Sequence, residues 1–90
     1  MPHFALICRD KPGAHEVRKA NRDAHLAYVH DSGAVLFGGP MLEDGQMRGS
    51  LLVIEAGDMQ AARAWAEADP YALAGLFESV EITEWKKVIG

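Results

Sequence analysis

One histidine and one carboxylate in this sequence have the types and settings needed for acid–base chemistry. His25 lies in a segment with helical periodicity, and Asp69 directly precedes Pro70, where a helix has to end. An imidazole can take up and return protons near neutral pH. A carboxylate bonded to it would fix its tautomer and raise its basicity. If the fold brings both side chains to one cleft, they form a general-base dyad.

Both residues also have a purely structural interpretation. On a helical wheel His25 lies at the boundary of an apolar stripe, to one side of Val17, Ala24 and Tyr28, where a histidine often bonds only to nearby backbone. Asp69 is well placed as a helix N-cap, because its carboxylate can accept from the free amides of the turn that follows. The two roles of Asp69 are compatible, since one carboxylate oxygen can cap while the other holds the imidazole.

Two arginines lie near His25 on the predicted helix, and a glycine-rich segment could contact a ligand. Arg18 and Arg22 precede His25 by seven and three positions, so both share its side of the helix. The Gly-Gly-Pro sequence at residues 38–40 permits close backbone approach or a bulge and could open backbone amides to a ligand. This segment lacks the spacing of a phosphate-binding loop, and glycine and proline that interrupt an edge strand are an alternative explanation for it.

Other kinds of catalytic centre have less support. The histidines show no i, i+4 pair and there is no cysteine cluster, so no metal site is predicted. Ser50 has no adjacent base in sequence and no nucleophile-elbow context. A freed amine on Pro2 could act as a base, as in a proline-amine tautomerase, but Met1 precedes it and leaves its nitrogen in an amide. Cys8 lies within an apolar strand pattern and is interpreted as a small core residue.

The hydrophobic pattern predicts four strands and two main helices to position these groups. Apolar or alternating runs predict strands over residues 3–9, 34–41, 48–55 and 77–85. Helices are predicted from Ala14 to about Asp31, closed by Ser32-Gly33, and from an N-cap at Asp58 to about Ala68, with a short turn over residues 70–75. The apolar stripe of the first helix consists of Val17, Ala20, Ala24 and Tyr28. A hairpin turn is predicted at Glu43-Asp44-Gly45-Gln46.

The order β-α-β-β-α-β is the split βαβ arrangement of ferredoxin-like α+β folds. A four-stranded antiparallel sheet then has two helices on one face. The strands are apolar on both faces: Phe4, Leu6 and Cys8 point one way, and Ala5 and Ile7 the other. A large bare apolar sheet face is not tolerated on a soluble monomer. We therefore predict that this face meets its copy in a two-fold homodimer with a barrel-like core.

Length and composition limit the class of protein. Ninety residues make a single domain over residues 1–90, and 49% apolar with 24% charged residues is typical of a soluble globule. The formal net charge of −4 gives no footprint for nucleic acid or an anionic membrane surface. No apolar run approaches the ~20 residues that span a bilayer. A single cysteine and the lack of a signal-peptide pattern predict a cytoplasmic protein.

The motifs taken together resemble a known family. In chain order they are Arg22-Asp23-Ala24-His25-Leu26-Ala27-Tyr28, Gly38-Gly39-Pro40, Gly49-Ser50 before an apolar strand, and Asp69-Pro70-Tyr71. Their order and separation, across essentially the whole chain, resemble the YCII-related (YciI-like) domain family. The resemblance implies a ferredoxin-like fold assembled as a dimeric α+β barrel. It also implies a small cleft in each subunit, with His25 and Asp69 as the active-site pair.

The resemblance favours a cofactor-independent lyase or isomerase, because dehydrochlorination of a substituted hydroquinone is the best-supported chemistry among the relatives. His25 would act as general base and acid, with Asp69 as its orienting carboxylate and no covalent intermediate. The residues expected to position a small polar, aromatic or anionic substrate are Arg22, Ser50, Tyr28, Tyr71, Gly39 and Pro40. The alternative is a non-catalytic dimeric module that binds a small metabolite or assists a partner enzyme.

Overall fold

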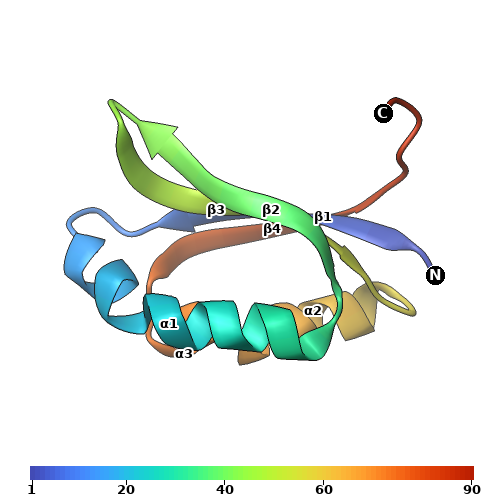
Figure 1. The fold of residues 1–90 in the computed structure, drawn as a ribbon, viewed down its shortest axis with the longest axis horizontal. Helices are drawn as coiled ribbons and strands as arrows, with labels where there is room; N and C mark the ends of the chain where they lie inside the picture. Colours follow the sequence, from blue (N-terminus) through green and yellow to red (C-terminus); the bar gives the residue numbers. More distant parts are fainter.

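Four antiparallel strands form one sheet in the computed structural model, which describes residues 1–90 (Figure 1). The strands are β1 (His3–Asp10), β2 (Val35–Glu43), β3 (Gln46–Glu55) and β4 (Phe77–Trp85). Their order in the sheet is β2-β3-β1-β4, so β1 and β3 are the two central strands. The chain order β-α-β-β-α-β confirms the predicted ferredoxin-like arrangement.

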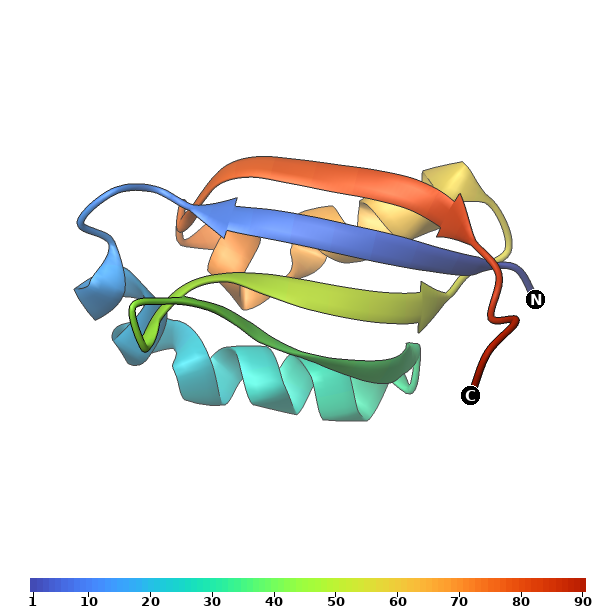
Figure 2. The same ribbon diagram turned by 90° about the horizontal axis from the view of Figure 1, so that it is seen from above.

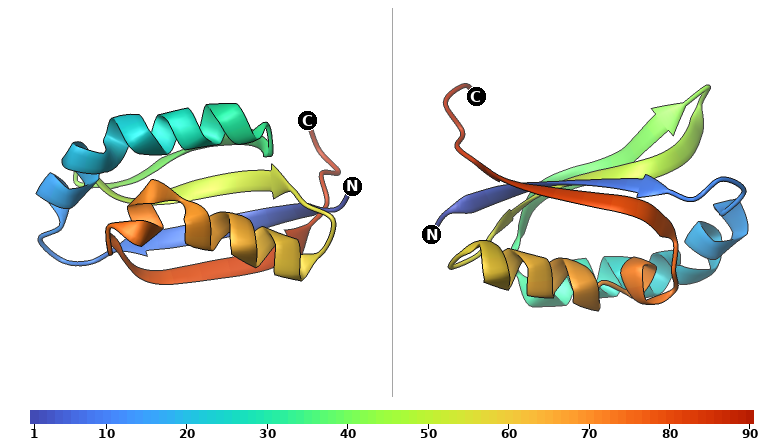
Figure 3. Two further views of the ribbon diagram at one scale, coloured as in Figure 1. Left: turned by 90° about the horizontal axis from the view of Figure 1, so that it is seen from below. Right: turned by 180° about the vertical axis from the view of Figure 1, so that it is seen from behind.

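Three helices lie on one face of this sheet, as Figure 1 shows from the side. They are α1 (His15–Ser32), α2 (Met59–Ala68) and the four-residue α3 (Pro70–Leu73). Figure 2 and the left view of Figure 3 show α1 along the β2 side of the sheet and α2 along the β4 side. None of the helices has both the length and the apolar character needed to cross a bilayer.

The predicted helix ends have the local chemistry that the sequence indicates. Gly33 ends α1 with φ of 65°, in the left-handed region that favours glycine. The carboxylate of Asp58 caps α2 by accepting from the Ala61 amide at 2.8 Å. These two caps determine where α1 ends before β2 and where α2 begins.

The β2–β3 hairpin is longer than predicted. Its turn consists only of Asp44 and Gly45, with φ of 51° and 77°, and Glu43 already pairs with Gln46. Positive φ at both central residues is typical of a two-residue type I′ turn, whose twist lets strand pairing continue up to the turn. Each strand therefore extends two residues further toward the hairpin than the hydrophobic pattern indicates.

An apolar core fills the space between the sheet and α2. Its members are buried side chains of both central strands and two small residues of α2: Phe4, Leu6, Leu52, Ile54, Ala62 and Ala66. The alternation predicted for β1 is observed, because Phe4, Leu6 and Cys8 are buried on the helix side. Alanines on α2 let the helix approach the sheet closely.

The inner face of α1 differs from the predicted apolar stripe. Ala20 and Ala24 are exposed, so the prediction that they face the core is wrong. The buried residues of the helix are instead Arg18 and His25, next to buried Ala14 just before its start. The hydrophobic pattern missed this because the inward side chains are polar and are paired with carboxylates from elsewhere in the chain.

The other face of the sheet carries no helix. Apolar side chains lie exposed on it, including Phe37 at 50% and Leu51 at 38% of their possible surface. Trp85 stacks on His3 with ring centroids 6.5 Å apart and meets Phe37 edge-on at 6.0 Å. This face is the one for which the sequence predicts a homodimer contact.

Candidate active site

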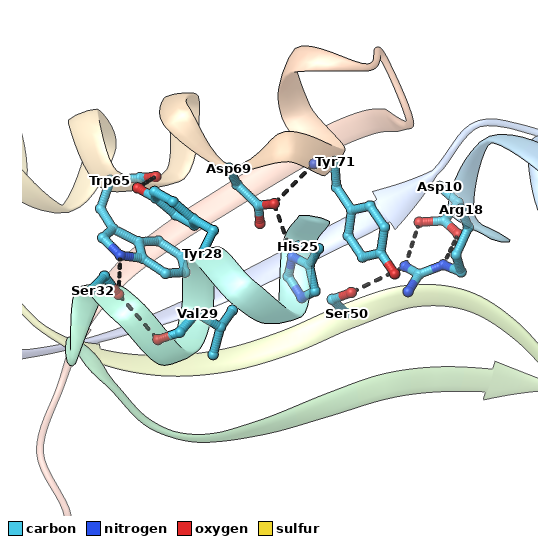
Figure 4. A network of polar contacts seen from close by, with 10 residues as sticks. All are labelled: Asp10, Arg18, His25, Tyr28, Val29, Ser32, Ser50, Trp65, Asp69 and Tyr71. Atoms are coloured by element: carbon cyan, nitrogen blue, oxygen red, sulfur yellow. Dashed lines mark hydrogen bonds and ion pairs between the residues drawn. The ribbon is translucent and has the colours of Figure 1, made fainter. Parts of the chain in front are cut away.

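The imidazole of His25 and the carboxylate of Asp69 are hydrogen-bonded in the structure (Figure 4). The distance from His25 Nδ1 to Asp69 Oδ1 is 2.8 Å, and both residues are buried, at 7% and 3% exposure. In the neutral imidazole with its proton on Nδ1, Nδ1 donates to the carboxylate and Nε2 keeps its lone pair. No protein group bonds to Nε2, and no fully buried polar side-chain atom lacks a partner, so Nε2 reaches solvent. Nε2 is therefore free to accept a proton.

Asp69 is held in place by the break between α2 and α3. It has an extended backbone conformation, with ψ of 130°, and Pro70 occupies the first turn of α3. Its Oδ1 accepts from the Tyr71 amide at 2.9 Å as well as from His25. The prediction of two oxygens with separate duties is wrong, since one oxygen serves both. Capping thus fixes the atom that orients the imidazole.

Tyr71 forms one wall against the imidazole. Its ring stacks on that of His25 with centroids 4.0 Å apart and planes 11° from parallel. The guanidinium carbon of Arg18 lies 4.8 Å from the centroid of the same ring. Figure 4 shows Tyr71 drawn between His25 and Arg18, so its ring connects the histidine to the arginine.

A buried ion pair lies beyond Tyr71. Arg18 donates from Nε and Nη2 to the two carboxylate oxygens of Asp10, at 2.7 and 2.9 Å. The same Nη2 donates to Ser50 Oγ at 3.0 Å. The side chains of Arg18 and Asp10 are only 6% and 5% exposed, so the pair is shielded from water and well satisfied by hydrogen bonds.

Burial changes the acidity of two of these groups. It disfavours the charged guanidinium, but hydrogen bonds and attraction from Asp10 outweigh this and raise the pKa of Arg18. Burial also raises the pKa of Tyr71, against the lowering effect of the Arg18 charge. At neutral pH the site therefore contains a charged arginine and a protonated phenol.

These groups border a cavity of about 220 Å³ between α1 and the β2–β3 hairpin. His25, Ser50, Tyr71 and Arg18 contribute its polar lining. Its apolar lining comes from α1 and from the strands, with Leu26, Val29, Val35, Met47 and Leu52. A volume below the ~300–1,000 Å³ of drug-sized pockets suits a ligand of about one ring.

Most of the predicted substrate-positioning residues line this cavity. Arg22 lies at its wall with a side chain 60% exposed and no partner closer than Asp23 at 4.0 Å. Ser50, Tyr71, Gly39 and Pro40 also belong to the lining. Gly38 beside them has no room for a side chain, because a Cβ there would clash with Leu52 on β3. The glycine-rich segment thus lets β2 lie close to β3 under the cavity.

Tyr28 is placed differently from the prediction. Its hydroxyl donates to the carbonyl of Trp65 on α2 at 2.8 Å, and it is absent from the cavity lining. Its position, three residues after His25, turns its side chain toward α2, where Trp65 in turn donates to Ser32 Oγ at 3.0 Å. Tyr28 therefore joins α1 to α2, and its placement does not support a role as cleft wall.

The hydrophobic pattern missed the Arg18–Asp10 pair and the apolar wall. A signal for Arg18 was present, because seven residues before His25 is two helical turns on the same face. Asp10, the last residue of β1, gave no such signal. No group of three or more His, Cys, Asp or Glu side chains is close enough to hold a metal ion.

Comparison with known proteins gives consistent matches over almost the whole chain. The family described as YCII-related domain matches residues 2–86. The protein YciI of Escherichia coli O6:H1 is 38% identical, over 94% of this chain and 97% of its own length. An uncharacterised protein of Haemophilus influenzae is 31% identical, over 96% of this chain and 98% of its own.

Two solved structures illustrate the range of structural similarity. The 5-chloro-2-hydroxyhydroquinone dehydrochlorinase from Burkholderia phenoliruptrix AC1100, in complex with 2,5-dihydroxybenzoquinone, has a TM-score of 0.87 and 35% identity over 93% of each chain. An antibiotic biosynthesis monooxygenase has a TM-score of 0.61 and 9% identity, over 99% of this chain and 100% of its own. The second similarity concerns the fold alone.

Proposed function

The chain belongs to the YCII-related domain family, and from this premise we propose that it is a small lyase in which His25 is the general base and acid. The observation that carries the proposal is the 2.8 Å bond from His25 Nδ1 to Asp69 Oδ1, which leaves Nε2 free at the cavity. Asp69 orients the imidazole and stabilises the imidazolium that forms when Nε2 takes a proton.

The proposed reaction is an elimination that needs no oxidant or reductant. Nε2 removes a proton from an acidic hydroxyl or C–H group of the substrate. A ring hydroxyl compound reacts as its keto tautomer, in which a hydroxyl proton has moved to the carbon that bears the leaving group. The electron pair left by deprotonation of another hydroxyl then moves through the adjacent double bond, expels the leaving group, such as chloride, as an anion, and leaves a quinone. The proton passes from His25 to solvent, so the substrate loses HX overall. Positioned acid–base groups of this kind contribute about 10²–10⁴-fold to a rate.

The proposed substrate is a small ring with ionisable oxygens. The apolar wall suits the ring, and the exposed guanidinium of Arg22 suits an anionic oxygen. The 35%-identical relative from Burkholderia phenoliruptrix is a dehydrochlorinase crystallised with a dihydroxybenzoquinone. This similarity supports a halogenated hydroxyaromatic compound as the first substrate class to examine.

The test compares two histidine variants of the chain. His25→Ala should lower chloride release from 5-chloro-2-hydroxyhydroquinone by about 10²–10⁴-fold. His30→Ala is the matched control, because His30 also faces an aspartate, Asp31 at 3.4 Å, but in an exposed pair with side chains 90% and 81% accessible. It should leave the rate unchanged. Circular dichroism checks that both variants fold.

Two results would count against the catalytic proposal. If folded His25→Ala releases chloride as fast as the unaltered protein, the imidazole is not the base. If the unaltered protein binds 2,5-dihydroxybenzoquinone but converts no compound in a panel of halogenated hydroxyaromatics, the non-catalytic binding module replaces the lyase.

We also propose that the protein is a homodimer through the helix-free face of the sheet. The exposure of Phe37 and Leu51 on that face supports this, because monomers seldom leave large apolar patches bare. Leu51→Lys should shift the protein toward monomer in sedimentation equilibrium. Leu73→Lys is the control, since Leu73 is 75% exposed on α3, on the opposite side of the molecule. A monomeric unaltered protein at micromolar concentration would contradict the proposal.

A further inference from the structure

The two arginines at the cavity differ in how many of their hydrogen-bond donors are free to bind a ligand. Arg22 has a side chain 60% exposed and no close partner. Arg18 is 5% exposed and already donates to both oxygens of Asp10 and to Ser50. The ring of Tyr71 covers its guanidinium at 4.8 Å. Arg18 is therefore held too firmly to turn toward a ligand: its Nε and Nη2 are engaged, and its Nη1 alone has no protein partner.

The bond from Arg18 determines what the hydroxyl of Ser50 can do. A guanidinium has no lone pair, so in the 3.0 Å contact Ser50 Oγ must accept. The hydroxyl keeps one proton to donate and one further lone pair, and no protein group bonds to either, although Ser50 is only 3% exposed. Ser50 lines the same cavity as His25. Its proton is thus available to a ligand there.

We propose that Asp10 and Arg18 are a positioning pair that fixes Ser50 as a hydrogen-bond donor, so that the cavity selects ligands presenting an oxyanion or carbonyl oxygen beside the group that His25 deprotonates. Asp10 fixes the plane of the guanidinium through two bonds, at 2.7 and 2.9 Å, and that plane directs Nη2 at Ser50. Ser50 Oγ keeps a second lone pair, but the guanidinium charge beside it repels the positive end of another N–H donor, so an acceptor oxygen is favoured over an amine there.

This inference deepens the proposed function, since it takes the cavity as the ligand site. Its test measures ligand binding, so the result does not depend on whether the protein converts a substrate. The probes are 2,5-dihydroxybenzoquinone, whose ring bears carbonyl and ionisable oxygens, and 1,4-diaminobenzene (the diamino probe), a ring of similar size that bears N–H groups and no oxygen. For each variant, titration calorimetry gives the dissociation constant of the diamino probe divided by that of the dihydroxy probe.

The unaltered protein should bind the dihydroxy probe at least about tenfold more tightly than the diamino probe, as a hydrogen bond to a charged group implies. Ser50→Ala should lower this ratio about tenfold. The double variant Asp10→Leu with Arg18→Met, in which the ion pair is replaced by apolar side chains, should lower it similarly. Combining all three substitutions should lower it no further, because the proposed effect of the pair passes through Ser50; a further fall would mean that Nη1 of Arg18 bonds to the ligand directly and would overturn the positioning role.

Several outcomes would overturn the inference. One is an unchanged ratio in Ser50→Ala, which would mean that its proton is not the donor. Another is an unchanged ratio in the folded Asp10/Arg18 double variant, which would leave Ser50 a donor without a positioning pair. A merely structural role would weaken both probes equally and keep the ratio. Equal binding of the two probes by the unaltered protein, or no binding of either, overturns it as well.

Discussion

The layer between the sheet and its helices has two halves, one packed with apolar side chains and the other containing buried polar pairs. Under α2 it is apolar, with Phe4, Leu6 and Ile54 at 1%, 1% and 0% exposure. Under α1 it contains the buried side chains of Arg18 and His25, with carboxylates from outside the helix as partners. Burying apolar surface stabilises a fold. Burying an ion pair contributes little net stability, because desolvation offsets the attraction.

The difference indicates which half is specialised. All polar atoms buried under α1 are hydrogen-bonded, so the groups are held in fixed orientations without leaving an orphan. The cavity lies in this half, and His25 and Ser50, the proposed base and the proposed donor, are oriented before any ligand arrives. The apolar half supplies the stability on which this arrangement depends.

The largest predicted effect comes from substituting the Arg18–Asp10 ion pair, which tests whether the polar half contributes net stability. Arg18→Met should lower the free energy of unfolding by about 3–5 kcal/mol, because Asp10 would remain as a buried charge without its partner. The double variant Asp10→Leu with Arg18→Met should recover most of that loss, since neither charge remains. Urea unfolding at one fixed protein concentration measures both.

A substitution in the apolar half is the control for this result. Ile54→Ala should cost about 2–5 kcal/mol through the cavity it leaves. While folded, it should bind 2,5-dihydroxybenzoquinone as the unaltered protein does, because Ile54 does not line the cavity. If the Asp10/Arg18 double variant were as unstable as Arg18→Met alone, the polar half would be a source of stability, and the contrast between the halves would fail.

The same contrast explains how far the sequence could be interpreted. In the apolar half, hydrophobic periodicity predicted β1, β3 and α2, because burial there follows side-chain character. On α1 it pointed to Ala20 and Ala24, which are exposed, while Arg18 is buried by a partner eight positions away at the end of β1. A pattern of apolar residues has no means to indicate a buried charge whose partner is set by the tertiary fold.

The pairing of His25 with Asp69 came from a different kind of signal. The residues are 44 positions apart, and neither spacing nor periodicity places them together. The short motifs around each, and their resemblance to a family, predicted that they meet. The local chemistry of Asp69 before Pro70 added the reason why a carboxylate should stand at that break. Their catalytic roles stay a prediction.

The smallest predicted effect concerns Cys8, which lies where the apolar and polar halves meet. It packs in the apolar core, and burial raises the pKa of its thiol to about 12, with the charges of Asp69 and Asp10 adding to the rise and Arg18 opposing it. The ordinary value is 9.0. The folded protein therefore holds this proton more tightly than the unfolded chain does. The resulting stability is fully present below pH 9 and declines as the pH rises toward 12.

Within that window the unaltered protein should lose about 1.4 kcal/mol of unfolding free energy per pH unit from this thiol alone. Cys8→Ala should show a shallower decline, because the tyrosines that titrate in the same range are common to both proteins and cancel in the difference. Urea unfolding between pH 8.5 and about 10.5 measures the two slopes. Parallel slopes would mean that the thiol is no more buried than in the unfolded chain, and that the boundary between the halves is open to water.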